Sequence, residues 1–270
     1  MYEKPKILVL GATGHVGRLL HGVPVPEFTQ NAVWHSRGRS GEKWSWDILN
    51  EHPSEVNFDG ILLLTRGSSA AQEVEIVQRV CDFAQGRPVL FASSQAVYGK
   101  QDGPISETFP VRPNSSYGEA KAAAEEIISA YPKGLSLRLG NVAGADMLFK
   151  EMATGPVALD QFEDGTGPKR SYIGPSTFAA LVVPLFKKLV KGSISSAVLN
   201  CANPGNVAMS DCLDQAGADW EWRPARVDAL HSLELNTTNL QKFVELNPAN
   251  AGDLVAETRL AGWRLYNESV

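Results

Sequence analysis

The segment SSYGEAKAAAEEII, residues 115–128, contains a tyrosine and a lysine four positions apart in a helix-like pattern. Residues with that spacing lie on one face of a helix, with Cβ atoms about 6 Å apart, so Tyr117 and Lys121 can touch. A free phenol has a pKa of about 10. A tyrosine therefore acts as a base near neutral pH only if a positive charge, such as the Lys121 ammonium, stabilises the phenolate. Because this spacing is common by chance, two unrelated residues on a surface helix are the alternative.

Two serines end a buried-type strand that lies upstream of this helix, in PVLFASSQAVYG at residues 88–99. Residues at the carboxyl end of a strand in a doubly wound sheet face the crevice where ligands bind, and a hydroxyl of Ser93 or Ser94 can hold a substrate oxygen there. A serine turn that caps the strand is the alternative. That alternative does not predict the tyrosine and lysine about twenty residues later, so the two features together favour an acid/base site.

Three glycines follow the first strand-like run, in GATGHVG at residues 11–17. A glycine at the strand end allows a tight turn, a second lets backbone N–H groups approach a pyrophosphate, and a third packs helix against sheet. The N-terminus of the following helix adds partial positive charge for an anion. The pattern predicts a dinucleotide site, and a turn needed only for packing is the alternative. The residues of this site are Gly11, Thr13, Gly14, His15, Val16 and Gly17.

The second strand-like run ends at Ser36 and Arg37, where a carboxylate normally holds the adenosine ribose of NAD. No carboxylate is present at that point of the sequence. Ser36 leaves room for a 2′-phosphate, and Arg37 can offer it charged donors. The sequence therefore favours NADP(H) over NAD(H), with a solvated loop charge as the alternative for Arg37.

Short apolar runs alternate with helix-period segments through the first half of the chain, which predicts a parallel sheet covered on both faces. We expect an α/β, Rossmann-type doubly wound fold over residues 1–144, completed by elements in about 172–202. Residues 145–171 and 203–270 are expected to form a small substrate-binding lobe. The predicted strands are KILVL (6–10), NAVWH (31–35), GILLLT (60–65), PVLFAS (88–93), LSLRL (135–139) and AVLNC (197–201), and the predicted helices span 15–22, 70–84, 116–130 and 177–190.

Composition excludes several classes of protein. With 43% apolar residues and a net charge of −5, the 270-residue chain has no broad basic field for a nucleic acid. The first strand starts too near the N-terminus for a signal peptide, no apolar stretch approaches a membrane span, and three scattered cysteines make no disulfide framework. We therefore expect a cytoplasmic protein. The five histidines form no HExxH-like pair, so no metal site is expected.

Four segments, GATGHVG, FASSQAVYG, PISETFPVRPNSSYGEAKAAAEE and RLGNVAG, occur in the order and at the spacing of one known family. Over residues 5–144 the chain resembles the extended short-chain dehydrogenase/reductases of the NAD-dependent epimerase/dehydratase type. The resemblance implies that Tyr117 is the general acid/base and Ser94 the catalytic serine. It also implies that Lys121 anchors the ribose and lowers the pKa of the tyrosine.

Further contacts follow from the same resemblance. Leu139 and Gly140 match positions beside the nicotinamide, and Gln95 and Asn141 are the implied substrate residues. Asp47 matches an aspartate beside the adenine, with a helix N-cap before the next residue as the alternative.

Two segments depart from the pattern of the family. At the return into the sheet, KRSYIGPS retains only Arg170 as a diphosphate ligand, with a solvated loop charge as the alternative. The fourth strand-like run, which also departs from the family, ends in Leu64, Thr65 and Arg66, and we assign these residues to cofactor binding. The Arg66 side chain could meet a cofactor phosphate, a substrate anion or only solvent. The lobe is also short for an enzyme that encloses a whole nucleotide-sugar.

We therefore expect hydride transfer between NADP(H) and a hydroxyl or keto carbon, with a nucleotide-sugar as substrate and 4-epimerisation or 4-keto reduction as the outcome. The alternatives are reduction of a smaller carbonyl substrate and a redox-sensing regulator that binds NADP(H) without catalysis. By analogy with similar proteins, the helices expected at 70–84 and 116–130 would pair in a homodimer.

Overall fold

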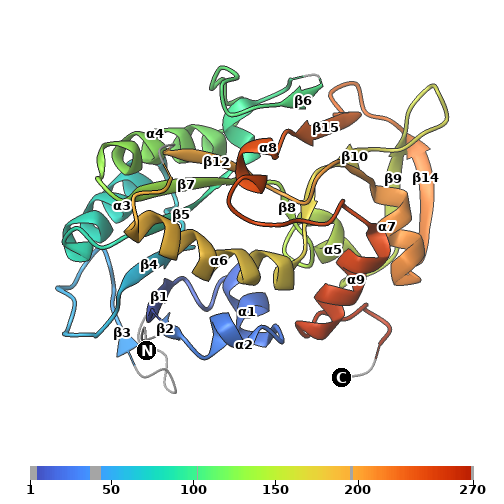
Figure 1. Cartoon of the computed structure of the whole chain (residues 1–270). Helices are drawn as coiled ribbons and strands as arrows, with labels where there is room; N and C mark the ends of the chain where they lie inside the picture. Colours follow the sequence, from blue (N-terminus) through green and yellow to red (C-terminus); the bar gives the residue numbers. More distant parts are fainter. Residues whose placement is uncertain (1–4, 37–43, 102, 195–196, 269–270) are drawn as a thin grey trace.

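A single parallel sheet of seven strands organises the protein, in the order β12-β7-β5-β4-β1-β2-β3 (Figure 1). The computed structural model describes residues 5–36, 44–101, 103–194 and 197–268. Strands β1 and β4 are neighbours although β2 follows β1 in the chain, so strand order reverses beside β1, as in doubly wound folds. The strands are β1 (Ile7–Leu10), β2 (Ala32–Ser36), β3 (Trp44–Ser45), β4 (Gly60–Leu63), β5 (Val89–Ser94), β7 (Gly134–Leu139) and β12 (Val198–Cys201).

Both faces of this sheet are buried, which is why its strands are continuous apolar runs. All four residues of β1 have no exposed surface. Because side chains alternate along a strand, Ile7 and Val9 pack into one hydrophobic cluster, while Leu8 and Leu10 pack into a second one on the opposite face. The sheet therefore lies between two separate layers of core.

Helices cover the two faces, as Figure 1 shows. One layer consists of α1 (His15–Gly22), α2 (Pro26–Thr29) and α6 (Pro175–Val190). The other consists of α3 (Ala70–Ala84) and α4 (Ser116–Ala130), which lie side by side. Since α6 packs on α1 and β12 pairs with β7, residues after the first half of the chain do contribute to the main sheet and its cover.

The remaining elements gather beside the carboxyl ends of the strands, to the right in Figure 1. Their small sheets are β13-β10-β15-β6, β11-β8 and β14-β9. This lobe shares the α1–α6 core cluster, since Leu213 and Leu254 belong to it. Its elements are β6 (Pro104–Ile105), β8 (Asn141–Val142), α5 (Met147–Met152), β9 (Val157–Gln161), β10 (Lys169–Arg170), β11 (Tyr172–Ile173), β13 (Val207–Ala208), α7 (Met209–Ala216), β14 (Trp220–Pro224), β15 (Ser232–Leu235), α8 (Thr238–Gln241) and α9 (Ala251–Leu260), and a short 3-10 helix η1 (Gln95–Tyr98) follows β5.

The doubly wound α/β fold expected from the sequence is confirmed, and helices α1, α3 and α4 have the predicted bounds. The short strand β3 at the sheet edge was not predicted. Among the described residues, no helix combines the length and apolar character that a bilayer crossing requires. The homodimer through α3 and α4 stays a prediction.

Candidate active site

The carboxyl ends of four neighbouring strands bring most of the predicted site residues to one edge of the sheet. The glycine turn follows β1, while β4, β5 and β7 end in the segments that carry the other predicted contacts. This edge lies at the reversal of strand order, where doubly wound sheets bind their ligands. The residues at the strand ends are Gly11, Leu64, Thr65, Ser94, Leu139 and Gly140.

The glycine turn has the close packing that its spacing predicts. Gly11 has a φ of +100°, and a Cβ at this position would lie 2.7 Å from the backbone N of Thr65 at the end of β4. A Cβ on Gly17 would lie 2.7 Å from the Cα of Ala12, so this glycine lets α1 approach the turn. Only glycine permits both the left-handed conformation and the close approach.

The N-terminus of α1 is open to an anion. Its cap residue Gly14 offers no side-chain hydrogen bond, and its first turn contains no acidic residue. Thr13, Gly14 and His15 are exposed, while Val16 is half-buried. The pKa of His15 is lowered by burial and by the positive charges of Lys150, Arg18 and Arg66. The first N–H groups and the helix dipole therefore face solvent at the position where a pyrophosphate would bind.

Ser94 and Tyr117 meet because α4 starts directly against the end of β5. The Ser115 hydroxyl caps α4 by accepting the N–H of Gly118 at 3.2 Å, as serine N-caps do. Gly118 has no room for a Cβ, which would lie 3.0 Å from the carbonyl carbon of Ala96 in η1. This contact brings the Tyr117 phenol within hydrogen-bonding reach of the Ser94 hydroxyl.

The pKa of Tyr117 is raised above its ordinary value, chiefly by burial of the phenol. Two groups oppose that rise: the hydrogen bond with Ser94 and the positive charge of Arg66. The Arg66 Cζ lies 5.4 Å from the centroid of the Tyr117 ring. The protein alone therefore holds Tyr117 as a protonated phenol at neutral pH.

Lys121 lies one turn after Tyr117 in α4 and forms an ion pair with the Glu73 carboxylate. Its Nζ is 2.7 Å from Oε1 of Glu73 in α3, and Lys121 and Glu73 are 3% and 0% exposed. Burial lowers the pKa of Lys121, while the charge of Glu73 and its hydrogen bond raise it. The Nζ lies 5.9 Å from the Tyr117 ring centroid. Helical spacing predicted Lys121 beside Tyr117, whereas Glu73 was not predicted.

A chain of hydrogen bonds joins the two predicted substrate residues to an aspartate that was not predicted. Gln95 Nε2 donates to Asn141 Oδ1 at 2.8 Å, and Asn141 Nδ2 donates to Asp146 Oδ2 at 3.0 Å. The same carboxylate oxygen accepts from the Tyr172 hydroxyl at 3.1 Å. Burial raises the pKa of Asp146 to about 6, against the lowering effect of these hydrogen bonds. Asp146 therefore orients the Asn141 amide.

Other residues that were predicted to contact the cofactor or substrate either form hydrogen bonds within the protein or lie outside the residues that the structure describes. Asp47 accepts from the backbone N–H of Leu49 at 3.2 Å, in a turn rather than a helix. Arg170 donates from Nη2 to the carbonyl of Leu230 at 2.6 Å and from Nη1 to Lys169 and His231 carbonyls. Its role toward a diphosphate stays a prediction. Ser36 is described only as the last residue of β2, and Arg37 lies outside the described residues.

A family model supports the resemblance read from the sequence. The model that matches residues 64–166 is described as the NAD dependent epimerase/dehydratase family. This match covers less than half of the chain. The matched residues include Arg66, Glu73, Ser94, Tyr117 and Lys121, so the similarity to this family lies in the segment that carries the candidate acid/base residues.

A curated protein and solved structures that are similar to this chain are named as sugar 4-epimerases. A curated UDP-glucose 4-epimerase of Lacticaseibacillus casei is 28% identical over 172 residues, 52% of this chain and 52% of that protein, so the match spans about half of the relative. A crystal structure of UDP-galactose 4-epimerase is 21% identical with a TM-score of 0.70, covering 93% of this chain and 97% of that one. UDP-glucose 4-epimerase from Brucella ovis in complex with NAD is 18% identical with a TM-score of 0.73, covering 96% and 99%. At these identities the two structures establish a shared fold.

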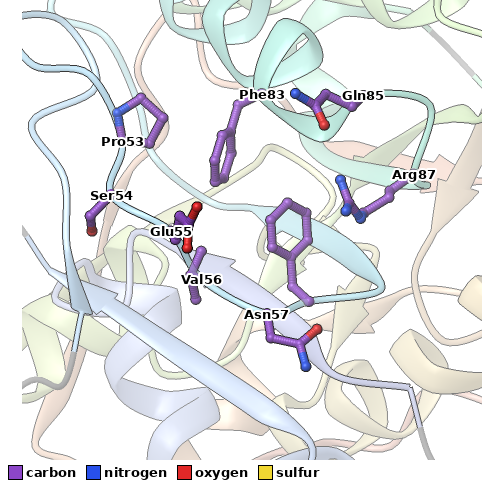
Figure 2. Close-up of a pocket in the computed structure, with 9 residues that line it drawn as sticks. Pro53, Ser54, Glu55, Val56, Asn57, Phe83, Gln85 and Arg87 are labelled. Atoms are coloured by element: carbon purple, nitrogen blue, oxygen red, sulfur yellow. The ribbon is translucent and has the colours of Figure 1, made fainter.

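A pocket of about 730 Å³ at the opposite edge of the sheet is separate from this site (Figure 2). Phe58 and Arg87 line it just before β4 and β5 begin, whereas the predicted site follows the ends of these strands. The Arg87 guanidinium lies 4.8 Å from the centroid of the Phe58 ring. None of the predicted site residues lines this pocket.

Proposed function

We propose that the protein is an NADP(H)-dependent oxidoreductase or epimerase that acts at a hydroxyl or keto carbon of a nucleotide-sugar. One observation carries the proposal: the Tyr117 phenol and the Ser94 hydroxyl lie within hydrogen-bonding reach of each other, at the strand edge that also holds the glycine turn. A phenol and a hydroxyl in this arrangement can hold one substrate oxygen and exchange a proton with it.

In the proposed reaction, Tyr117 takes a proton from the substrate hydroxyl when the carbon is oxidised and returns it when the keto group is reduced. Ser94 donates to the same oxygen and fixes its position. When bound, the nicotinamide supplies the hydride acceptor or donor, and its oxidised ring adds positive charge. That charge favours the phenolate, whose pKa the protein alone holds high.

The residues present fit a dinucleotide. The exposed, uncapped start of α1 suits the pyrophosphate, and Gly11 and Gly17 allow the backbone approach that it needs. Leu139 and Gly140, where β7 ends, are assigned to the nicotinamide, and Lys121 to the ribose. The preference for NADP(H) rests on Ser36 and Arg37 in place of a carboxylate. We expect Arg37→Ala to weaken NADPH binding by about tenfold or more with little change for NADH, whereas an equal effect on both would favour NAD(H).

The nucleotide-sugar is supported by the relatives. The curated relative is named a UDP-glucose 4-epimerase, and a solved structure of similar fold is a UDP-N-acetylglucosamine 4-epimerase from Methanobrevibacter ruminantium M1 in complex with UDP-N-acetylmuramic acid. Gln95, Asn141 and Arg170 are the residues proposed to contact substrate. Turnover by the purified protein without added NADPH would favour epimerisation, and turnover only with NADPH would favour 4-keto reduction.

The deciding experiment incubates the protein with cofactor and a panel of UDP-sugars and 4-keto-sugar nucleotides, and follows products by chromatography. Tyr117→Phe should lower turnover by about a hundredfold or more with nearly unchanged NADPH affinity. Tyr266→Phe is the matched control, because that phenol is on the surface and donates to Asp219. Full activity of Tyr117→Phe would refute the proposed acid/base role.

A further inference from the structure

The proposed acid/base reaction makes no use of the carboxylate of Glu73. Its Oε1 is the partner of Lys121 Nζ at 2.7 Å, and its Oε2 accepts the backbone N–H of Gly67 at 2.6 Å. Glu73 has no exposed surface. A buried carboxylate with two such partners is held in one position, and its negative charge lies at the ammonium that the sequence assigned to the stabilisation of Tyr117.

The positive charge of Lys121 is therefore compensated by the Glu73 carboxylate in contact with it. Two opposite charges in contact act at a distance as a dipole, and their joint effect on a third group is much weaker than that of either alone. The Nζ of Lys121 is 5.9 Å from the Tyr117 ring centroid, more than twice its distance to Glu73. The pair consequently contributes little net positive charge at the phenol.

The surroundings of the Arg66 guanidinium differ from those of the Lys121 ammonium. It belongs to the segment after β4, and its Cζ lies 5.4 Å from the Tyr117 ring centroid, within the range of a cation–π contact. No ion pair to Arg66 occurs in the part of the chain that the structure describes. The loop that carries it is fixed next to α3, because a Cβ on Gly67 would lie 2.9 Å from the Cα of Glu73.

Four groups face the Tyr117 phenol from the elements packed around it: Arg66 from the segment after β4, Glu73 from α3, Ser94 from β5 and Lys121 from α4. Arg66 lowers the pKa of Tyr117, of Lys121 and of His15, so its positive charge acts across the whole edge of the site. Glu73 raises the pKa of Tyr117. The two cations near the phenol thus differ: Lys121 is in contact with a carboxylate, and Arg66 has no such partner among the described residues.

We propose that Arg66, rather than Lys121, supplies the positive charge by which the protein stabilises an ionised Tyr117, because Glu73 cancels the charge of Lys121. Lys121 is left as the buried partner of Glu73, with its Nζ 5.9 Å from the Tyr117 ring centroid, and Arg66 is a positioning residue that acts through Tyr117. The inference deepens the proposed function and depends on it only for the chemical role of Tyr117.

The test is a pH titration of tyrosines labelled with ¹³C at Cζ, followed by NMR on the whole chain, with the Tyr117 signal assigned from its loss in Tyr117→Phe. Arg66→Met should raise the pKa of Tyr117 by about 1, and Arg66→Lys should restore most of the original value. Because Arg66 is exposed, its replacement should leave the fold intact. Arg79→Met, the loss of an exposed arginine in α3, is the control and should leave the signal unchanged.

A second variant tests whether Glu73 cancels the positive charge of Lys121. The double variant Glu73→Gln with Lys121→Met removes both charges while Gln can still accept the N–H of Gly67, and neutral replacement of a whole buried pair is tolerated better than loss of one partner. It should change the pKa of Tyr117 less than Arg66→Met does. A rise with the double variant and none with Arg66→Met would overturn the proposal. The titration needs no substrate, so it decides this inference even if the proposed reaction fails.

Discussion

Arg138 of β7 and Glu125 of α4 form a buried, two-armed ion pair directly behind the candidate site. Arg138 Nη2 lies 2.7 Å and Nε 3.0 Å from the carboxylate oxygens, and both side chains are less than a tenth exposed. The hydroxyl of Ser93, next to the candidate catalytic serine, donates to the same carboxylate. The Arg138 Cζ also lies 4.7 Å from the Tyr98 ring centroid. This pair fixes α4, and with it Tyr117, against the ends of β5 and β7.

Loss of one partner should therefore destabilise the protein strongly. We expect Arg138→Met to lower the free energy of unfolding by about 3–5 kcal/mol, because it leaves the Glu125 carboxylate buried without its counter-ion. Urea denaturation followed by circular dichroism measures the change. Arg79→Met removes an exposed helix pair with Glu75 and should cost less than about 1 kcal/mol. Similar losses in the two variants would contradict the anchoring role of Arg138.

The fold was predictable because its signals are local. Continuous apolar runs predicted the buried strands, and the glycines of GATGHVG predicted a turn in which Gly11 has a positive φ. The approach of Tyr117 and Lys121 on one face of α4 was also predictable, because helical spacing alone brings these two residues together. Strands of two residues such as β10 and β11 carry no such pattern, and only tertiary pairing defines them.

The charged partners Glu73 and Asp146 were not predicted, because their contacts depend on tertiary packing rather than on a local sequence pattern. Glu73 is one of several acidic residues in α3, and its neighbour Glu75 is exposed; only the packing of α3 against α4 selects which carboxylate meets Lys121. Asp146 reaches Asn141 through the loop after β8, which no periodicity describes. The one signal available for Glu73 was its place on the inward face of a helix, one turn before the buried Ile76 and Val77.

Gly17 should be intolerant of even a methyl group. We expect Gly17→Ala to lower the free energy of unfolding by about 1–3 kcal/mol, since its Cβ would overlap Ala12 and force α1 away from the turn. This strain exceeds the gain in helix propensity of about 1 kcal/mol. NADPH titration should show weaker binding in the same variant. Gly155→Ala, where a Cβ meets nothing within 4 Å, is the control; equal stability of the two variants would refute the close approach.

Asp146 should make stability depend on pH in the direction opposite to that of a salt-bridged carboxylate. Its pKa of about 6 in the folded state exceeds the ordinary value of 3.8, so the folded state binds the proton more tightly than the unfolded state. The contribution is fully present below the ordinary value and is lost as pH rises through about 6, by up to about 3 kcal/mol.

The difference between wild type and Asp146→Asn isolates this contribution. The free energy of unfolding of wild type minus that of the variant should fall between about pH 4 and pH 7, as measured by urea denaturation at several pH values. Asp82→Asn, on the exposed face of α3, controls for the general loss of one carboxylate. A difference that stays constant across this range would show that the Asp146 carboxyl is not enclosed as described.

The three cysteines should be inert in the folded protein. Cys81, Cys201 and Cys212 are buried as free thiols, and burial raises the pKa of each to about 12. Since the thiolate is the reactive form, only about one thiol in ten thousand is ionised at pH 8, and access to reagent is blocked as well. Ellman's reagent should find almost no thiol in the native protein and all three in concentrated guanidinium chloride. Rapid release of one equivalent from the native protein would mean that one of these thiols lies in an open or electropositive environment, in conflict with its burial.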